Sequence, residues 1–263
     1  MTAVIELKGV SWRRGDNEIL RNIDWRVESG QHWAVLGLNG SGKTSILNMI
    51  NGYMWPTTGE ISVLGHKFGT VDLRELRKSI GWVSSSLQEK IRPNEQALEI
   101  VISGRHASIG LYAGIEEDDR VRAEELMRDL GCAHLIGRAY QTCSQGEKQK
   151  LLIARALMAS PKLLILDEAS NGLDFISREA LLQSINGLAS RADAPTLLLV
   201  THHIEEISPL FSHSLLIRRG RVFAQGRSEE ILSSERLSDF FELPVDVEWR
   251  GGRAWLSAKS SEV

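Results

Sequence analysis

The sequence is poor in cysteine, with only Cys132 and Cys143 in 263 residues. Two cysteines are too few for the disulfide framework of a small secreted domain, and they fit a reducing compartment. Residues 1–6 also lack the basic start and unbroken apolar run of a signal peptide. We therefore expect a cytoplasmic protein.

Long apolar runs are missing as well, since none approaches the ~18 residues that a membrane-spanning helix needs. Any role at a membrane therefore requires another chain. The net charge of −3 gives no reason to expect nucleic acid as a partner, although local basic patches remain possible. With 42% apolar and 25% charged residues, the composition is that of an ordinary globular protein of one large or two small domains.

What the sequence does contain is a glycine-rich stretch at residues 37–44, which reads Gly-Leu-Asn-Gly-Ser-Gly-Lys-Thr. This is the pattern of the phosphate-binding P-loop. Residues 32–36 before it have the character of a short buried strand, and residues 45–50 after it have helical spacing. A glycine-rich turn with a surface lysine is the alternative, but the strand–loop–helix setting favours nucleotide binding.

The residue types of this stretch suit a polyphosphate. Glycines without a Cβ let the backbone curl and turn its N–H groups inward, and the helix start adds a partial positive charge. Lys43 can reach the β- and γ-phosphates, and the Thr44 hydroxyl can ligate Mg²⁺. The expected nucleotide-binding residues are Gly37, Leu38, Asn39, Gly40, Ser41, Gly42, Lys43 and Thr44.

Apolar periodicity predicts an antiparallel opening, because two alternating stretches are separated by the turn residues 15–17. From about residue 94 to residue 138 the apolar residues take helical spacing, which we interpret as a helical insertion. Outside it, strands are predicted at residues 4–10, 23–27, 60–63 and 80–83.

Two more buried strands, residues 163–166 and 196–201, end in Asp167-Glu168 and in His202-His203. Ligands of parallel α/β sheets bind at the carboxyl ends of the strands, so these side chains are expected near the P-loop. Adjacent strand residues point to opposite sides, so the two carboxylates have different roles. Asp167 is expected to hold Mg²⁺ together with Thr44, and Glu168 to orient and polarise the attacking water.

Two further features have more than one interpretation. Ser144 with Glu147 three residues later forms a capping-box pattern, which marks either a well-capped helix or a helix start that faces an anion. Trp12, at the end of the first strand, is either a partly buried tryptophan or an aromatic that stacks on a base.

In the order and spacing of these motifs, residues 4–230 resemble the ATP-binding subunits of ABC transporters. The resemblance implies an α/β P-loop NTPase (RecA-like) core with an N-terminal antiparallel β subdomain and an α-helical subdomain inserted at about residues 88–160. It implies an ATPase domain over residues 1–230, followed by a C-terminal extension at 231–263. The segments that carry it are residues 37–44, 144–147, 163–168, 171–174 and 200–202.

The resemblance also implies roles for single residues. Trp12 would stack on adenine, and Ser144 and Gly146 would bind the γ-phosphate of an ATP held by a second copy in a head-to-tail dimer. Residues 171–174 would communicate across that dimer, and His202 would contact the γ-phosphate. The implied catalytic residues are Glu168, His202 and Lys43, which would hydrolyse ATP with Mg²⁺.

The same family works with transmembrane permeases, which implies a separate permease chain and a peripheral position at the inner face of the cell membrane. An importer is the first hypothesis. A soluble ABC-type ATPase without a permease, as in iron–sulfur assembly, is the second, since residues 146–148 have some likeness to that group. A nucleotide-binding module that does not hydrolyse is disfavoured because Glu168 and His202 are both present.

The chain departs from the family pattern at several positions. Gln145 stands where the signature usually has glycine, and Ala169 where proline often follows the glutamate. The glutamine expected after the strand at 80–83 falls on Ser85, with Gln88 three residues later. This substitution puts a water-mediated Mg²⁺ contact and coupling to a permease in doubt. Residues 102–106 faintly resemble a segment of importer ATPases for iron chelates and cobalamin.

The C-terminal tail predicts a β-hairpin at residues 245–258 with a two-residue turn at Gly251-Gly252. Pairing Arg250 with Arg253 gathers the apolar side chains on one face. We expect that face to pack on the protein's own body, with a partner surface as the alternative.

Overall fold

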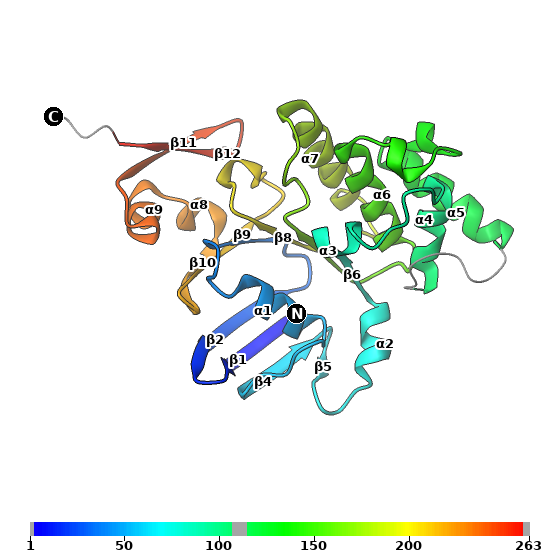
Figure 1. The fold of residues 1–263 in the computed structure, drawn as a ribbon. Coiled ribbons are helices and arrows are strands. Elements are labelled where there is room, and N and C mark those ends of the chain that lie inside the picture. Colours follow the sequence, from blue (N-terminus) through cyan, green and yellow to red (C-terminus); the bar gives the residue numbers. More distant parts are fainter. Residues whose placement is uncertain (1–2, 107–114, 260–263) are drawn as a thin grey trace. The chain divides into compact units, whose positions relative to one another are not determined.

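The computed structural model describes residues 3–106 and 115–259. The chain forms two compact units (Figure 1). Met1–Arg77 and Thr196–Val263 make one, here called the P-loop unit, and Lys78–Pro195 make the other, the insert unit. Among the described residues, no helix is both long enough and apolar enough to cross a membrane.

The P-loop unit opens with the predicted antiparallel sheet, which is confirmed. Its strands are β1 (Ala3–Arg14), β2 (Asn17–Glu28), β4 (Thr58–Val63) and β5 (His66–Lys67), in the order β2-β1-β4-β5. β1 and β2 extend further than the sequence pattern predicted, because their pairing continues to Arg14 opposite Asn17. One face of the pair is buried, as their alternation requires.

A second sheet of the P-loop unit contains the P-loop strand β3 (Trp33–Leu36). β3 runs parallel to β8 (Thr196–Thr201) on one side and to β9 (His213–Arg218) on the other. β10 (Arg221–Arg227) then pairs antiparallel with β9. β3 and β8 are buried along their whole length, which explains their continuous apolar sequences. Helix α1 (Lys43–Ile50) follows β3 and is followed, after β4 and β5, by α2 (Leu73–Lys78).

The C-terminal part of the same unit contains α8 (Ser228–Ile231), α9 (Ser234–Phe241) and the predicted hairpin, β11 (Val245–Arg250) and β12 (Arg253–Ala258). The predicted register is confirmed, with Arg250 opposite Arg253. Gly251 and Gly252 both have positive φ, 59° and 77°, as this type of tight turn demands. β12 packs on the short helix η4 (Ile204–Glu206), so the hairpin does rest on its own unit (Figure 1).

The insert unit contains the parallel strand pair β6 (Ile80–Val83) and β7 (Leu163–Asp167) together with the predicted helices. Its main helices, α4 (Ala97–Ser103), α5 (Glu117–Asp129) and α6 (Gln145–Leu157), pack on one another through their apolar faces. Its helices are α3 (Ser85–Gln88), α4 (Ala97–Ser103), η1 (Gly104–His106), α5 (Glu117–Asp129), η2 (Ala133–Leu135), η3 (Tyr140–Thr142), α6 (Gln145–Leu157) and α7 (Phe175–Ala189).

The segment at residues 102–106, which carries the faint importer resemblance, packs closely on α6. A Cβ on Gly104 would lie 1.9 Å from the carbonyl oxygen of Arg155. The Arg155 Nε donates to Ser103 Oγ at 3.2 Å, and burial lowers the pKa of this guanidinium. Helix packing by itself accounts for a small residue at position 104.

Candidate functional site

The P-loop adopts a backbone that requires glycine. Gly40 and Gly42 have φ values of 76° and 107°, in the left-handed region. A Cβ on Gly37 would lie 2.4 Å from Ser41 Oγ, and a Cβ on Gly42 would lie 2.5 Å from Leu20 Cδ2. The three glycines thus allow the chain to curl tightly between β3 and α1.

Lys43, the first residue of α1, lies folded over this loop. Its side chain is 8% exposed, and its Nζ donates to the carbonyl oxygen of Gly37 at 2.5 Å and to that of Leu38 at 3.3 Å. The start of α1 has no side-chain cap and no acidic residue in its first turn. Nothing in the helix itself therefore compensates the partial positive charge at this end, and the ammonium group adds to it.

A second polar atom of the loop is also suited to an anion. Ser41 Oγ is buried and has no hydrogen-bond partner among the described residues. An unpaired buried hydroxyl is costly, and a phosphate oxygen is the kind of acceptor that would satisfy it. The curled glycine backbone, the cation and this hydroxyl together fit the phosphates of a nucleotide.

His202 follows directly on a strand that is the neighbour of β3. Leu36 pairs with Thr201, so the P-loop and the histidine segment leave the sheet side by side. The predicted convergence of these two strand ends is confirmed within the P-loop unit. The rings of His202 and His203 lie 4.2 Å apart between centroids.

Trp12 lies on β1 opposite Leu20, the residue that contacts the P-loop at Gly42. Its side chain is half-buried. This position suits both interpretations of the tryptophan, so adenine stacking stays a prediction.

In the insert unit, Asp167 ends β7 and Glu168 follows in a left-handed conformation, with φ of 51°. For a residue with a Cβ this backbone costs roughly 1–2 kcal/mol. The carbonyl oxygen of Glu168 accepts from the N–H of Asn171 at 3.0 Å, which helps to hold the turn. Sequence reasoning missed this strain because no residue pattern encodes it, and strained backbone of this kind gathers at functional sites.

The predicted capping box at the start of α6 is confirmed. The Glu147 N–H donates to Ser144 Oγ at 3.3 Å, and the Ser144 N–H donates to Glu147 Oε2 at 2.7 Å. His134 and Arg138 lie 2.9 and 3.6 Å from Glu147 Oε1. Burial pushes the pKa of Glu147 up, but the hydrogen bonds from His134 and Ser144 and the charge of Arg138 outweigh it and lower the pKa.

Gln88, at the end of α3, forms hydrogen bonds with α6. Its Nε2 donates to Gln145 Oε1 at 2.7 Å, and its Oε1 accepts from Gln149 Nε2 at 3.1 Å. Gln145 and Gln149 are four residues apart and so share one face of α6. Sequence reasoning placed Gln88 near the family's glutamine position but missed these contacts.

The site residues are thus divided between the two units. The P-loop unit brings together residues 37–44, His202 and Trp12, whereas Ser144, Gly146, Asp167 and Glu168 belong to the insert unit.

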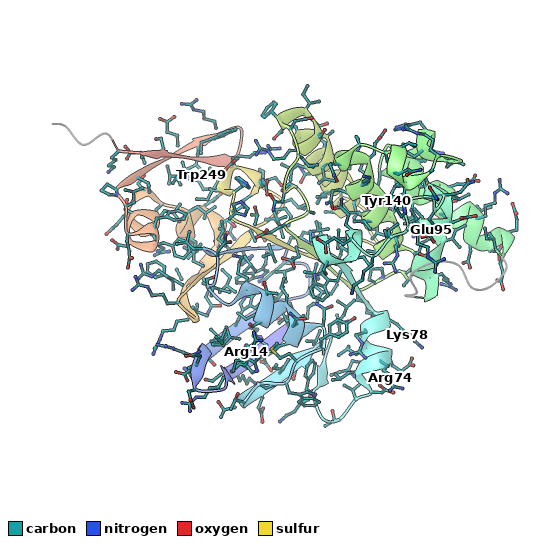
Figure 2. The ribbon with its side chains drawn as sticks, in the orientation of Figure 1. Arg14, Arg74, Lys78, Glu95, Tyr140 and Trp249 are labelled. Carbon is teal, nitrogen blue, oxygen red and sulfur yellow. The ribbon has the colours of Figure 1, made fainter. Side chains whose placement is uncertain are left out.

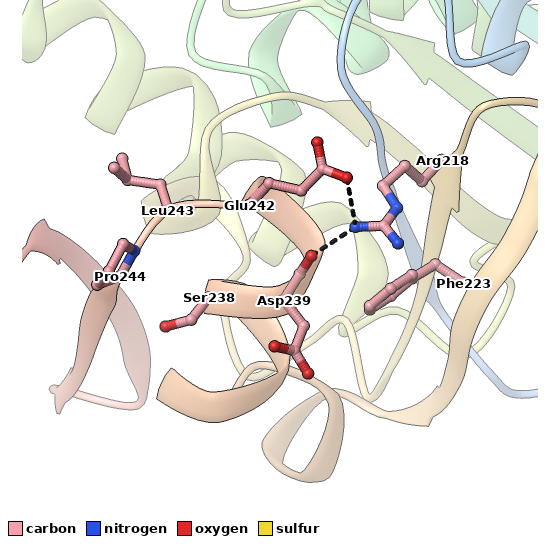
Figure 3. A pocket seen from close by; sticks show the side chains of 7 residues that line it. All are labelled: Arg218, Phe223, Ser238, Asp239, Glu242, Leu243 and Pro244. Atoms are coloured by element: carbon pink, nitrogen blue, oxygen red, sulfur yellow. Dashed lines mark hydrogen bonds and ion pairs between the residues drawn. The ribbon is translucent and has the colours of Figure 1, made fainter.

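A cavity of about 600 Å³ in the P-loop unit is lined by none of these residues. Figure 3 shows Arg218 in it, with interactions to the carbonyl oxygen of Asp239 and to the carboxylate of Glu242. The Arg218 guanidinium lies 4.4 Å from the centre of the Phe223 ring and also donates to the carbonyl oxygen of Phe240. Arg218 thus satisfies the carbonyl end of α9, which is a structural role. The residues that line this cavity are Arg218, Phe223, Ser238, Asp239, Glu242, Leu243 and Pro244.

Comparison with known proteins agrees with this geometry. The sequence profile of the ABC transporter family matches residues 20–171. The chain is 49% identical over 255 residues to the uncharacterized ABC transporter ATP-binding protein YlmA of Bacillus subtilis (strain 168), and the match covers 97% of each chain.

Two solved structures have similar folds. One is an inward-facing conformation of a metal-chelate type ABC transporter, with a TM-score of 0.81 and 24% identity over 99% of each chain. The other is an ATP-binding cassette solved as a dimer in a post-hydrolysis state with ADP and phosphate. It has a TM-score of 0.71 and 26% identity, and covers 85% of this chain and 98% of that one. Because the profile spans more than half of the sequence and the curated relative spans nearly all of it, this chain belongs to the ATP-binding proteins of the ABC transporter family, with their P-loop ATPase fold.

Proposed function

We propose that this chain hydrolyses ATP with Mg²⁺ and so energises a separately encoded permease, as part of an importer at the inner face of the cell membrane. The observation that carries the proposal is the start of α1. There an uncapped helix end, the Lys43 ammonium and the buried Ser41 hydroxyl all favour a bound polyphosphate. The full-length match to a transporter ATP-binding protein supports the same function.

The available oxygen donors fit Mg²⁺. Thr44 is exposed in the first turn of α1, and Asp167 ends β7, so a hydroxyl and a carboxylate are offered. Among the described residues, no three His, Cys, Asp or Glu side chains gather as a metal site of their own. Mg²⁺ commonly takes one or two protein ligands together with substrate phosphates, and when bound it neutralises charge on the β- and γ-phosphates.

The protein's own groups would then perform the hydrolysis. Lys43 would hold the γ-phosphate oxygens and stabilise the charge that they gain in the transition state. Glu168 would orient the attacking water and polarise it through a carboxylate oxygen. His202 would donate a hydrogen bond to the γ-phosphate, and Trp12 would stack on the adenine ring.

We further propose that two copies act head to tail, so that Ser144 and Gly146 of one copy face the P-loop of the other. Ser144 Oγ accepts from Glu147 in the capping box, and its O–H proton can still be donated to a phosphate. The dimeric ADP- and phosphate-bound cassette supports this arrangement by its similarity in fold.

The proposal is tested first with Glu168→Gln, which keeps the size of the side chain and removes the carboxylate that activates water. The variant should bind ATP without cleaving it and elute as an ATP-dependent dimer in gel filtration. ADP in place of ATP is the control and should leave it monomeric.

A mixing experiment tests the shared site. Lys43→Ala disables a chain's own P-loop, and Ser144→Arg disables the surface that it offers to its neighbour. In a mixed dimer both defects fall in one site, so mixing two nearly inactive proteins should recover part of the ATPase activity. A Glu168→Gln protein that stays monomeric at saturating ATP, together with no recovery on mixing, would contradict the shared-site proposal.

An ATPase without a permease is the second candidate function. It is favoured by the departure from the family pattern after the strand at 80–83. A serine stands at position 85 in place of the family's glutamine, and the nearby Gln88 is hydrogen-bonded to Gln145 and Gln149. The two candidates differ in one measurement. Affinity-tagged Glu168→Gln, trapped with ATP, should retain an integral membrane chain from detergent-solubilised membranes if the transporter proposal holds, and retain none if the second candidate does.

A further inference from the structure

The C-terminal hairpin is held against η4 and its neighbouring loop. A two-stranded hairpin is marginally stable by itself, so it needs a surface to pack on. Ala254 on β12 is 0% exposed, whereas Trp249 near the turn is 42% exposed (Figure 2). The buried Ala254 thus belongs to the strand that contacts η4.

The hairpin turn fixes this contact closely. A Cβ on Gly252 would lie 2.6 Å from Cγ of Pro209, a ring atom that has little room to move. A Cβ on Gly251, the other turn residue, would meet no atom of the described residues within 4 Å. Both glycines have positive φ, so the same substitution strains the turn similarly but only the one at 252 pushes it off the loop.

The short helix that the hairpin contacts, η4, has little stability of its own. η4 has three residues and no side-chain cap, and single 3₁₀ turns have poor hydrogen-bond geometry. It nevertheless carries Glu206, whose side chain is 1% exposed and whose Oε2 accepts from Thr201 Oγ1 at 2.6 Å. A carboxylate at such depth stays there only if its hydrogen-bond donors are held in place.

The same hydroxyl connects η4 to the histidine pair. The N–H of His203 donates to Thr201 Oγ1 at 3.0 Å, and the carbonyl oxygen of His203 accepts from the Glu206 N–H at 3.3 Å. The His203 ring lies against that of His202. A shift of η4 is therefore passed to the segment that leaves β8 beside the P-loop.

We propose that the C-terminal hairpin and Glu206 are positioning elements for His202. The hairpin clamps η4, Glu206 fixes Thr201 and His203, and His203 in turn sets the direction of the His202 ring. This rests on the proposed function in one respect, namely that His202 acts on the γ-phosphate.

The test compares Gly252→Ala with Gly251→Ala in the full chain. Gly252→Ala should lower the kcat of ATP hydrolysis about tenfold, because small displacements of a catalytic group are costly. KM and the equilibrium affinity for ATP should stay within twofold of wild type. Gly251→Ala, which has the same strain without the contact, should stay within about twofold of wild type in kcat.

A double-mutant cycle separates positioning from a general structural effect. If the hairpin acts through His202, Gly252→Ala should cause no further loss in a His202→Ala background, measured under single-turnover conditions. Glu206 supplies the second variant pair. Glu206→Ala should lower kcat, and Glu206→Gln, which keeps an acceptor for Thr201, should restore most of it.

Three results overturn the inference, and they are distinguishable. Equal kcat values for the two glycine variants would show that the contact does not matter. An undiminished Gly252→Ala loss in the His202→Ala background would assign the effect to general structure. A wild-type kcat in His202→Ala would remove the proposed role of the histidine itself, and with it this inference, while leaving hydrolysis by the P-loop intact.

Discussion

The starts of α1 and α6 differ in how the unpaired backbone N–H groups of the first helical turn are satisfied. The first backbone N–H groups of any helix lack partners within the helix. At α6, Ser144 and Glu147 provide them through a reciprocal capping box. At α1, the capping position is Gly42, which has no side chain to offer and a φ of 107°.

The difference separates a helix start that is already capped by its own side chains from one that has no side-chain cap. Glu147 is hydrogen-bonded to His134 and lies 3.6 Å from Arg138, so the α6 start is held by its own side chains without an anion. The α1 start instead gathers positive charge, with Lys43 folded against the loop carbonyls. We therefore expect substitutions at the α1 start to affect nucleotide chemistry, and removal of the capping carboxylate at the α6 start to affect stability as well as the proposed shared site.

The largest effect is expected for Lys43→Ala. Removing the cation that we propose to stabilise charge on the γ-phosphate should lower ATP hydrolysis by about 100-fold or more. Phosphate release from purified protein measures it. Lys162→Ala, which removes an exposed lysine elsewhere, is the control and should keep wild-type activity. Full activity in Lys43→Ala would remove the contrast between the two helix starts.

Much of this contrast could be predicted from sequence because its signals are local. The P-loop occupies residues 37–44 in one run, and the capping box joins residues only three positions apart. The hairpin register followed from a two-residue glycine turn and alternation of period two. Each of these is a rule about neighbours along the chain.

The features that were missed join distant residues or depend on backbone geometry. Gln88 and Gln145 are 57 positions apart, and no periodicity links them. The left-handed conformation of Glu168 has no residue signature, since glycine is the usual sign of positive φ. The contact of the hairpin with η4 likewise depends on where the fold places Pro209.

Trp12→Ala is expected to have the next largest effect and extends the comparison to the neighbourhood of α1. Loss of a stacking surface should weaken ATP binding by about 1–3 kcal/mol, by analogy with base stacking on proteins. Trp12→Tyr keeps a flat ring and should bind nearly as well. Fluorescent-nucleotide titration measures the affinities, with Trp55→Ala as the control for loss of a half-exposed tryptophan in the same unit. Equal affinities for wild type and Trp12→Ala would make Trp12 a packing residue.

At the α6 start, Glu147→Ala should destabilise the protein by about 1 kcal/mol, the usual worth of a helix cap. The pKa of Glu147 is below its ordinary value of 4.5, so its stabilising effect is present above that pH and is lost as the pH falls through the lowered pKa. The difference in Tm between wild type and variant should therefore stay constant from pH 7 down to about pH 4.5 and shrink as the pH falls further.

Glu117→Ala is the matched control for this prediction, because Glu117 is an exposed acid in the first turn of α5 and that helix has no side-chain cap. Its effect on Tm should be a small fraction of that of Glu147→Ala. A difference between wild type and Glu147→Ala that grew on acidification would contradict the assigned direction of the pKa shift.

The smallest effects on ATP hydrolysis are expected for two residues of α3, Gln88 and Ser85. Gln88→Ala leaves the amides of Gln145 and Gln149 to water, at a cost of about 0.5–1.5 kcal/mol, and should lower ATP hydrolysis a few-fold by loosening the start of α6. Ser85→Ala should change ATP hydrolysis by less than about twofold, because a serine reaches less far than the glutamine that the family has there.

A double mutant tests the bond between Gln88 and Gln145. Gln145→Gly restores the family's residue and removes the bond to Gln88, so adding Gln88→Ala to Gln145→Gly should have less effect than Gln88→Ala alone. The measurement is the steady-state rate of ATP hydrolysis of Gln88→Ala, Ser85→Ala, Gln145→Gly and the double mutant Gln145→Gly/Gln88→Ala. A Ser85→Ala protein as inactive as Lys43→Ala would show that position 85, despite its short side chain, performs the glutamine's role itself.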